Sequence, residues 1–162
     1  MGRDVKVLPK LPTVDGLLVK AVAGMLKRPG VVKALPNRTL MVMNHKTDVA
    51  ALAAYNQVTG FSLRDEMPAT WLHVLTFPLQ TTLMASDDFP FSLAGLVHVT
   101  NEMTLHRPVK VGEDLRITVR TDNLAAHAKG AVFDMVGEIH VGDELVWRGV
   151  SNYLASGAKV EG

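Results

Sequence analysis

Cysteine, a marked excess of charge and long apolar runs are all missing from this 162-residue chain. Without cysteine there is no disulfide framework, thiol nucleophile or cysteine-ligated metal site. Lys and Arg number 17 against 16 Asp and Glu, so no strong field is present to hold nucleic acid or an anionic membrane. The apolar stretch over residues 16–26 contains Lys20 and is too short to span a bilayer. We therefore expect a cytoplasmic protein that binds neither nucleic acid nor membrane.

Local signatures of metal, nucleophile and phosphate sites are missing as well. The six histidines show no His-x-x-x-His pair or similar short ligand spacing, so a zinc or iron site would need ligands from distant segments. The chain has no Gly-x-Ser-x-Gly elbow, no Gly-x-Gly-x-x-Gly run and no phosphate loop. The sequence therefore predicts neither a bound metal nor a cofactor.

The first third of the chain predicts an arm, a strand and a short helix. Residues 1–38 carry one patch of apolar residues at helical spacing, which predicts an N-terminal arm with a short helix. Thr39 to Met43 predicts a strand. Thr47 or Asp48 then provides an N-cap for a helix that ends at Gly60. The apolar patch of the arm consists of Leu17, Leu18, Ala21, Val22 and Met25.

A longer helix is predicted after a polar stretch that covers Phe61 to Glu66. Over residues 67–84 the apolar side chains lie nearly all round a helix, and Pro68 suits a first-turn position. A helix of this kind needs cover on most of its sides. We therefore expect it at the centre of the fold.

Strands dominate the rest of the chain, because the apolar period changes from helical spacing to alternation. Residues 97–105 predict a half-buried strand whose apolar face carries Val97, Val99, Met103 and Leu105. Three further strands are predicted over residues 115–121, 131–141 and 145–154, with residues 123–130 between the first two. Gly142-Asp143 suits the tight turn of a hairpin. This order predicts one α+β domain over residues 39–156, in which an antiparallel sheet wraps around a central apolar helix, followed by a tail over residues 157–162.

Six short stretches, spread in order over most of the chain, carry a further signal. They are Leu35 to Thr39, Tyr55 to Gly60, Met67 to Pro78, Phe89 to Phe91, Gly95 to Asn101 and His106 to Val109. Together they resemble the MaoC-like hot-dog family of acyl-thioester dehydratases and hydratases. The resemblance is stronger to the first half of the two-hot-dog 3-hydroxyacyl-thioester dehydratases of actinobacterial type. It implies a hot-dog fold that assembles as a dimer.

The chain departs from the family at the catalytic motif. In the family's catalytic halves a Gly-Asp-x-Asn-Pro-x-His run follows the first helix, and its Asp and His activate water or take a proton from the acyl chain. Here Gly60 is followed by Phe61-Ser-Leu-Arg-Asp-Glu66, so Phe61 stands in the Asp place and Glu66 in the His place. The resemblance therefore implies a substrate-binding half that lacks the catalytic dyad.

The same resemblance implies the ligand and its contacts. The ligand is an acyl thioester of coenzyme A or of acyl carrier protein, and a second hot-dog, in a homodimer or a heterodimer, supplies the chemistry. Backbone N–H groups in the first turn after Pro68 suit the thioester oxygen. The implied substrate contacts are Thr70, Trp71, His73, His98 and Asn101.

Two alternatives stay open, so the sequence leaves enzyme activity undecided. His73, with Asp65 or Glu66 as its partner, is a candidate general base of a self-sufficient homodimeric hydro-lyase. The same residue is also explained as a histidine that only packs or forms hydrogen bonds in the core or at a dimer interface. The other alternative is a scaffold without a ligand, whose tunnel is filled by its own side chains.

His98 stands on the polar face of its predicted strand, where a cross-strand hydrogen bond is expected.

Overall fold

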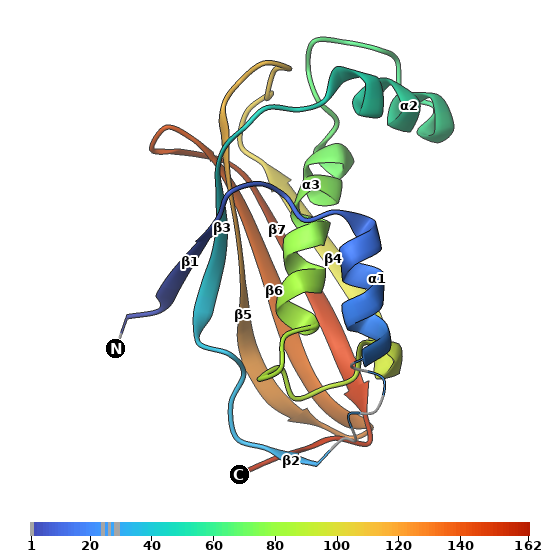
Figure 1. Ribbon diagram of the computed structural model, residues 1–162, viewed down its shortest axis with the longest axis vertical. Coiled ribbons are helices and arrows are strands. Elements are labelled where there is room, and N and C mark those ends of the chain that lie inside the picture. The colour runs from blue at the N-terminus through green and yellow to red at the C-terminus, as the bar shows by residue number, and fades with distance from the viewer. Residues whose placement is uncertain (1, 24, 26, 28–29) are drawn as a thin grey trace.

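A six-stranded sheet with one long helix across its inner face forms the body of the protein (Figure 1). The structure is a computed structural model that describes residues 2–23, 25, 27 and 30–162. Met1, Gly24, Leu26, Arg28 and Pro29 lie outside the described residues. The helices are α1 (Val14–Ala23), α2 (Val49–Thr59) and α3 (Ala69–Met84), with a short 3₁₀ turn at Leu93–Gly95. The strands are β1 (Asp4–Leu8), β2 (Val31–Val32), β3 (Arg38–His45), β4 (Leu96–Leu105), β5 (Leu115–His127), β6 (Gly130–Val141), β7 (Glu144–Ser156) and β8 (Lys159–Val160).

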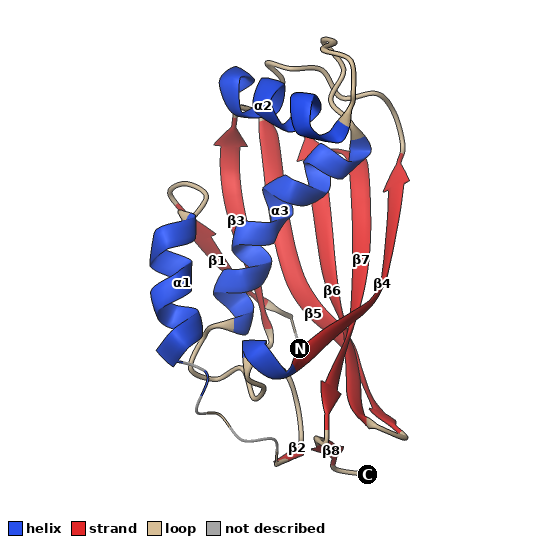
Figure 2. Ribbon diagram, turned by 90° about the vertical axis from the view of Figure 1, so that its right-hand side faces the viewer, coloured by secondary structure: helices blue, strands red, loops and turns tan. Residues whose placement is uncertain are grey.

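The strand order in the large sheet is β1-β3-β5-β6-β7-β4. All neighbours pair antiparallel except β1 and β3, which are parallel. Strands β2 and β8 form a separate parallel pair. Figure 2 shows β1 and β4 at opposite edges of the large sheet, with α1 and α3 side by side on its inner face. This arrangement confirms the predicted α+β hot-dog architecture.

Helix α3 supplies most of the helical half of the core. Its buried residues recur on the side that faces the sheet, where they meet inward side chains of β3, β5, β6 and β7. The opposite flank is not covered, because Val74 and Phe77 are 40% and 52% exposed. The helix is therefore enclosed by the sheet on one side only. The buried residues of α3 are Trp71, Leu72, Leu75, Thr76, Leu79, Gln80, Leu83 and Met84.

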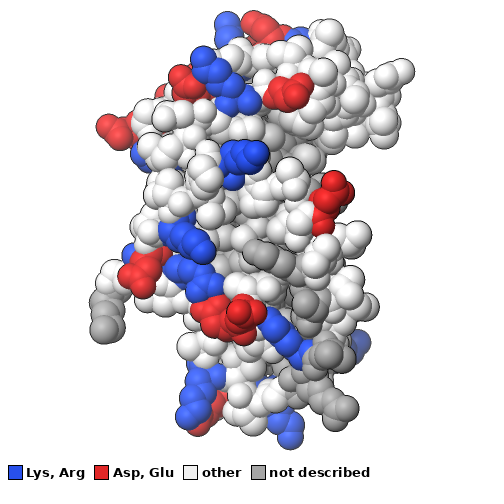
Figure 3. All heavy atoms as spheres, viewed as in Figure 1, with Lys and Arg blue, Asp and Glu red and all other residues white. Residues whose placement is uncertain are grey.

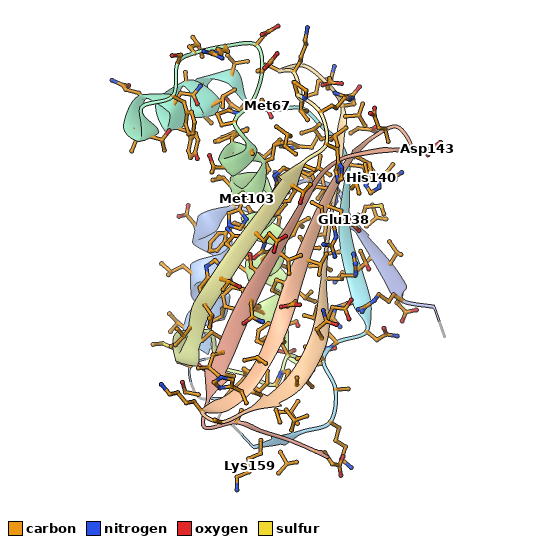
Figure 4. All side chains as sticks on the ribbon, turned by 180° about the vertical axis from the view of Figure 1, so that it is seen from behind. Met67, Met103, Glu138, His140, Asp143 and Lys159 are labelled. Carbon is orange, nitrogen blue, oxygen red and sulfur yellow. The ribbon has the colours of Figure 1, made fainter. Side chains whose placement is uncertain are left out.

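The outer face of the sheet is polar and charged. Figure 4 looks onto this face, where Glu138 and His140 of β6 lie. Glu138 accepts a hydrogen bond from Arg120 at 2.8 Å, and its other carboxylate oxygen lies 3.9 Å from Arg148. Figure 3 shows Lys and Arg groups beside Asp and Glu groups over the face of the molecule seen in Figure 1. None of the helices that the structure describes is long and apolar enough to cross a membrane.

Local signals fixed several elements as predicted. The Asp48 carboxylate accepts hydrogen bonds from the N–H groups of Ala50 and Ala51, so Asp48 is the N-cap of α2 and Thr47 is not. Gly60 ends the helix with a φ of 80°, in the left-handed region that favours glycine. The turn at Gly142-Asp143 joins β6 and β7 into an antiparallel pair, as expected.

Other elements differ from the predictions. The arm over residues 1–38 contributes more than a helix, since β1 adds a strand beside β3. Strand β5 continues to His127 past an irregularity between Asp122 and Ala125, where Asn123 has a φ of 52°. Residues 123–127 were therefore wrongly predicted to be a loop, because a bulge removes the alternation that marks a strand.

Candidate functional site

A pocket of about 360 Å³ opens at the N-terminus of α3. It is formed by the loop between the C-cap of α2 and Pro68, and its lining includes Phe61, Arg64 and Glu66. Pro68, the N-cap residue of α3, makes no capping hydrogen bond through its side chain. The first-turn N–H groups of α3 therefore lie beside the pocket without a capping side chain, and such groups attract an oxygen that gains negative charge.

Thr70 and Trp71 are held together by Tyr55 of α2. The Tyr55 hydroxyl donates a 2.6 Å hydrogen bond to Thr70 Oγ1, and the Tyr55 and Trp71 rings lie 5.3 Å apart. Tyr55 also stacks on Phe61 with a centroid distance of 6.4 Å. Thr47 accepts a weak hydrogen bond of 3.4 Å from Trp71 Nε1. These contacts build an aromatic support behind the pocket.

His73 lies on the flank of α3 that faces β4 and β7. Its ring centroid is 6.4 Å from that of Trp147 on β7, and its buried Nδ1 has no partner among the described residues. Burial lowers the pKa of His73, and the nearby charge of His98 lowers it further. The imidazole is therefore neutral at pH 7.

Neither proposed carboxylate partner contacts His73. Asp65 lies 3.7 Å from the ammonium group of Lys110, and Glu66 pairs with Lys110 through the backbone. Both acids are exposed. Within the described part of one chain, no hydrogen bond or ion pair joins either of them to His73. The dyad of the alternative hypothesis is thus not assembled inside a single protomer.

A bulge in β4 moves His98 and Asn101 to the inner face of the sheet. The register shifts between His98 and Thr100, so that His98 pairs with Tyr153 and Asn101 with Ser151. The predicted polar face for His98 was therefore wrong, because one extra residue reverses the alternation. His98 stacks on Tyr153 at 4.7 Å in place of the expected cross-strand hydrogen bond, while Ser151 donates a 3.3 Å hydrogen bond to Asn101.

The candidate site therefore has two parts. Thr70 and Trp71 lie in the first turn of α3 against Tyr55, next to the pocket but outside its lining, and His73, His98 and Asn101 belong to the flank between α3 and β4. No group of three or more His, Asp or Glu side chains suited to a metal ion occurs among the residues that the structure describes.

Comparisons with known proteins place this site in a family context. No known protein-family profile matches the chain. The chain is 36% identical over 137 residues to 3-hydroxyacyl-thioester dehydratase X of Mycobacterium tuberculosis, which covers 85% of this chain and 49% of that protein. The crystal structure of HtdX of M. tuberculosis matches with a TM-score of 0.69 and 35% identity, over 74% of this chain and 51% of that one. The chain is a homologue of HtdX and has the hot-dog fold of MaoC-like proteins.

One further hot-dog structure is similar in fold alone. The ChsH1-ChsH2 complex of M. tuberculosis matches with a TM-score of 0.54 at 17% identity, over 93% of this chain and 95% of that one. The present chain spans about half the length of the dehydratase X and HtdX relatives that it matches.

Several residues of this hot-dog site could not be assigned from the sequence. Tyr55, Trp147 and Tyr153 reach it from elements distant along the chain, and only their pairing in the fold brings them to α3 or β4. Gln80 is the exception, because its residue type is a signal in the sequence. A buried amide side chain within an apolar helix needs a hydrogen-bond partner.

Proposed function

We propose that this chain is an acyl-thioester-binding hot-dog, the substrate-binding half of a 3-hydroxyacyl-thioester dehydratase or enoyl-thioester hydratase. One observation carries the proposal. The pocket at the N-terminus of α3 is lined by Phe61 and Glu66, at the two places where the family's catalytic halves have Asp and His. In this proposal the chain retains a ligand pocket at the place of the catalytic site, but it has lost the Asp and His dyad that performs the chemistry in the family's catalytic halves.

The pocket suits the head of a thioester. In dehydration or hydration, negative charge develops on the thioester oxygen, and backbone N–H groups at a helix N-terminus stabilise it. The first turn of α3 offers such donors, and the Phe61 ring, which stacks on Tyr55, offers apolar surface for the adjoining chain. The carrier is coenzyme A or acyl carrier protein.

A second hot-dog is proposed to supply the missing acid and base. The dehydratase relative is about twice as long as the aligned part, which leaves room there for another domain of this size. The ChsH1-ChsH2 structure is by its name a complex of two different chains. For this chain, the partner is either another hot-dog chain or a further part of the same protein.

Strand β4 and the open flank of α3 are the proposed contact surface for that partner. β4 is a ten-residue edge strand, and Val97 and Val99 on it are 51% and 53% exposed. Val74 and Phe77 on the open flank of α3 form a second group of exposed apolar side chains. Unpaired edges and exposed apolar patches of this kind favour association with another sheet.

The binding proposal is tested by titrating the chain with dodecanoyl-CoA in a calorimeter. Phe61→Glu places a charge in the pocket wall and is expected to weaken binding by about tenfold or more. Leu63→Glu is the matched control, because Leu63 lies in the same loop outside the pocket lining and is 69% exposed. Equal binding by both variants would place the ligand elsewhere.

The self-sufficient hydro-lyase is the second candidate, favoured by the unpaired Nδ1 of His73. It requires a partner protomer to bring a carboxylate to His73. If it is correct, the purified chain hydrates enoyl thioesters, and His73→Gln lowers the rate by about two to four orders of magnitude while binding persists. If His73 only packs against Trp147, the same variant changes stability and leaves acyl-thioester binding intact. His106→Gln, at an exposed position, is the control.

A further inference from the structure

Three polar side chains form a row along the flank of α3 that faces β7. They are His73, Thr76 and Gln80, spaced so that they lie one above another on the helix. Gln80 Nε2 donates to Thr76 Oγ1 at 3.1 Å, and the Thr76 hydroxyl donates to the backbone carbonyl of His73 at 2.8 Å. The row is thus internally linked.

Trp147 of β7 lies against this polar row. Its ring centroid lies 6.4 Å from that of His73. Trp147 and Thr76 also lie close together, since both approach Gly137. A Cβ placed on Gly137 would be 3.1 Å from Thr76 Cγ2 and 3.4 Å from Trp147 Cζ3. Trp147 is wholly buried and Gln80 is 1% exposed. The Trp147 ring is therefore enclosed in the core next to the polar row.

Three atoms around this row have no hydrogen-bond partner among the described residues. They are His73 Nδ1, Gln80 Oε1 and Trp147 Nε1. Each buried polar atom left unpaired destabilises the folded state, because it has lost its hydrogen bonds to water. Leucine or phenylalanine would avoid this cost in a core that served stability alone. Three such atoms together point to a ligand that completes their hydrogen bonds.

The chemistry of the three atoms indicates which group fits. Trp147 Nε1 can only donate, and Gln80 Oε1 can only accept. A hydroxyl group both accepts and donates, whereas a keto oxygen only accepts and a methylene does neither. A hydroxyl is therefore the small group that pairs with both sides of the row.

The place of the row along α3 separates this hydroxyl from the one at the reacting carbon. With a rise of about 1.5 Å per residue, His73 lies about 6 Å and Gln80 about 17 Å along the axis from the start of the helix at Ala69. An extended chain advances about 1.2 Å per bond, so these positions correspond to roughly 5 to 14 bonds beyond the thioester. A 3-hydroxyl group is only two bonds away.

We propose that the row of His73, Thr76 and Gln80, together with Trp147 beside it, recognises a hydroxyl group in the middle of the acyl chain. The inference rests on the proposed function, since the thioester is placed at the N-terminus of α3. The row is closed over in this structure, since Thr76, Gln80 and Trp147 are buried, so the acyl chain reaches it only when these side chains move apart. The ligand class is a long acyl thioester hydroxylated near its middle.

The test compares octadecanoyl-CoA, 10-hydroxyoctadecanoyl-CoA and 10-oxo-octadecanoyl-CoA in calorimetric titrations of the purified chain. The hydroxylated thioester is expected to bind about tenfold more tightly than the unsubstituted one, with the oxo compound in between. In Gln80→Leu the preference is expected to fall to within about twofold, while octadecanoyl-CoA still binds. Gln57→Leu, the same change at an exposed position on α2, is expected to keep the full preference.

Other outcomes have distinct meanings. Equal binding of the hydroxylated and unsubstituted compounds by the native chain would overturn this inference and leave acyl-thioester binding intact. Failure of all three compounds to bind would refute the proposed function, and the inference with it. If Gln80→Leu does not fold, Trp147→Phe removes the indole donor and is expected to abolish the preference in the same way.

Discussion

Alanine at Gly149 is expected to disturb the packing beneath the proposed ligand site. A Cβ there would lie 2.3 Å from Cη2 and 2.8 Å from Cζ2 of Trp147, far inside van der Waals contact. The ring has little room to move away, because it is wholly buried and also lies near Gly137, whose own Cβ would be 3.4 Å from Cζ3. The indole must therefore shift toward α3.

The size of the effect follows from two opposing contributions. Overpacking of a filled core costs about 1–3 kcal/mol, and the close approach here favours the upper end. Replacing glycine by alanine restores about 0.4–1 kcal/mol by restricting the unfolded chain. The net loss is about 2 kcal/mol, which lowers the Tm of a domain of this size by about 4–8 °C.

Thermal and urea unfolding monitored by circular dichroism measure this loss directly. Gly95→Ala is the matched control, because a Cβ there meets nothing within 4 Å, and its stability should stay the same or rise slightly. Trp147→Phe removes the ring atoms that clash, so in its background Gly149→Ala should cost at least about 1 kcal/mol less. A Tm of Gly149→Ala within about 1 °C of the native value would refute the packing described for Trp147.

Three further predictions concern pH, an ion pair and assembly. Burial lowers the pKa values of His45, His73 and His140. The stability that their neutral forms provide is therefore complete above the ordinary histidine pKa of about 6.5 and is lost as the pH falls through the lowered values. Urea unfolding at pH 7.5 and at pH 5 should show this loss of stability, and His73→Phe should reduce the loss. The hydrogen bonds from Arg38 lower the pKa of Asp88 to about 2. Asp88→Asn should therefore cost about 1 kcal/mol of stability near pH 7, after allowance for the 54% exposure of this carboxylate. The difference in stability between this variant and the native chain should vanish as the pH falls from about 4 through 2. The chain should be a dimer by light scattering, and Phe77→Glu should dissociate it while Val58→Glu on α2 should not; a native chain that is monomeric at working concentrations would contradict the contact surface proposed for β4 and α3.

The parts of the fold that could be predicted from the sequence are those that depend on nearby residues. The cap of α2 at Asp48 and the hairpin at Gly142 involve groups a few residues apart, and their residue types specify the backbone directly. The position of α3 followed from its apolar residues, because no other helical segment needed so much cover.

The parts that escaped prediction depend on pairing between distant segments. The bulge at Val99 arises where β4 meets β7, and it decides which face His98 and Asn101 occupy. Likewise, β1 becomes a strand only by pairing with β3. Asp4 of β1 pairs with Arg38 of β3, about thirty-four residues further along the chain. Alternation within a single segment contains no information about either event.

The candidate site was predictable to the same extent. The proposed correspondence of Phe61 and Glu66 to the two dyad positions was counted along the chain, and the structure places both residues at one pocket. The distance of His73 from Asp65 could not be counted, because the Asp65 loop pairs with Lys110 on another segment. The spatial neighbours of α3, such as Trp147, could not be predicted because they are defined only once all strands of the sheet have paired.

The central claim is that this chain binds acyl thioesters without converting them. It is tested most directly by incubating the purified chain with crotonyl-CoA and dodecenoyl-CoA, following hydration by loss of the enoyl absorbance, and titrating dodecanoyl-CoA against the same preparation. The account predicts saturable binding of dodecanoyl-CoA and a hydration rate no higher than the buffer background. Robust hydration by the chain alone, abolished by His73→Gln, would contradict it.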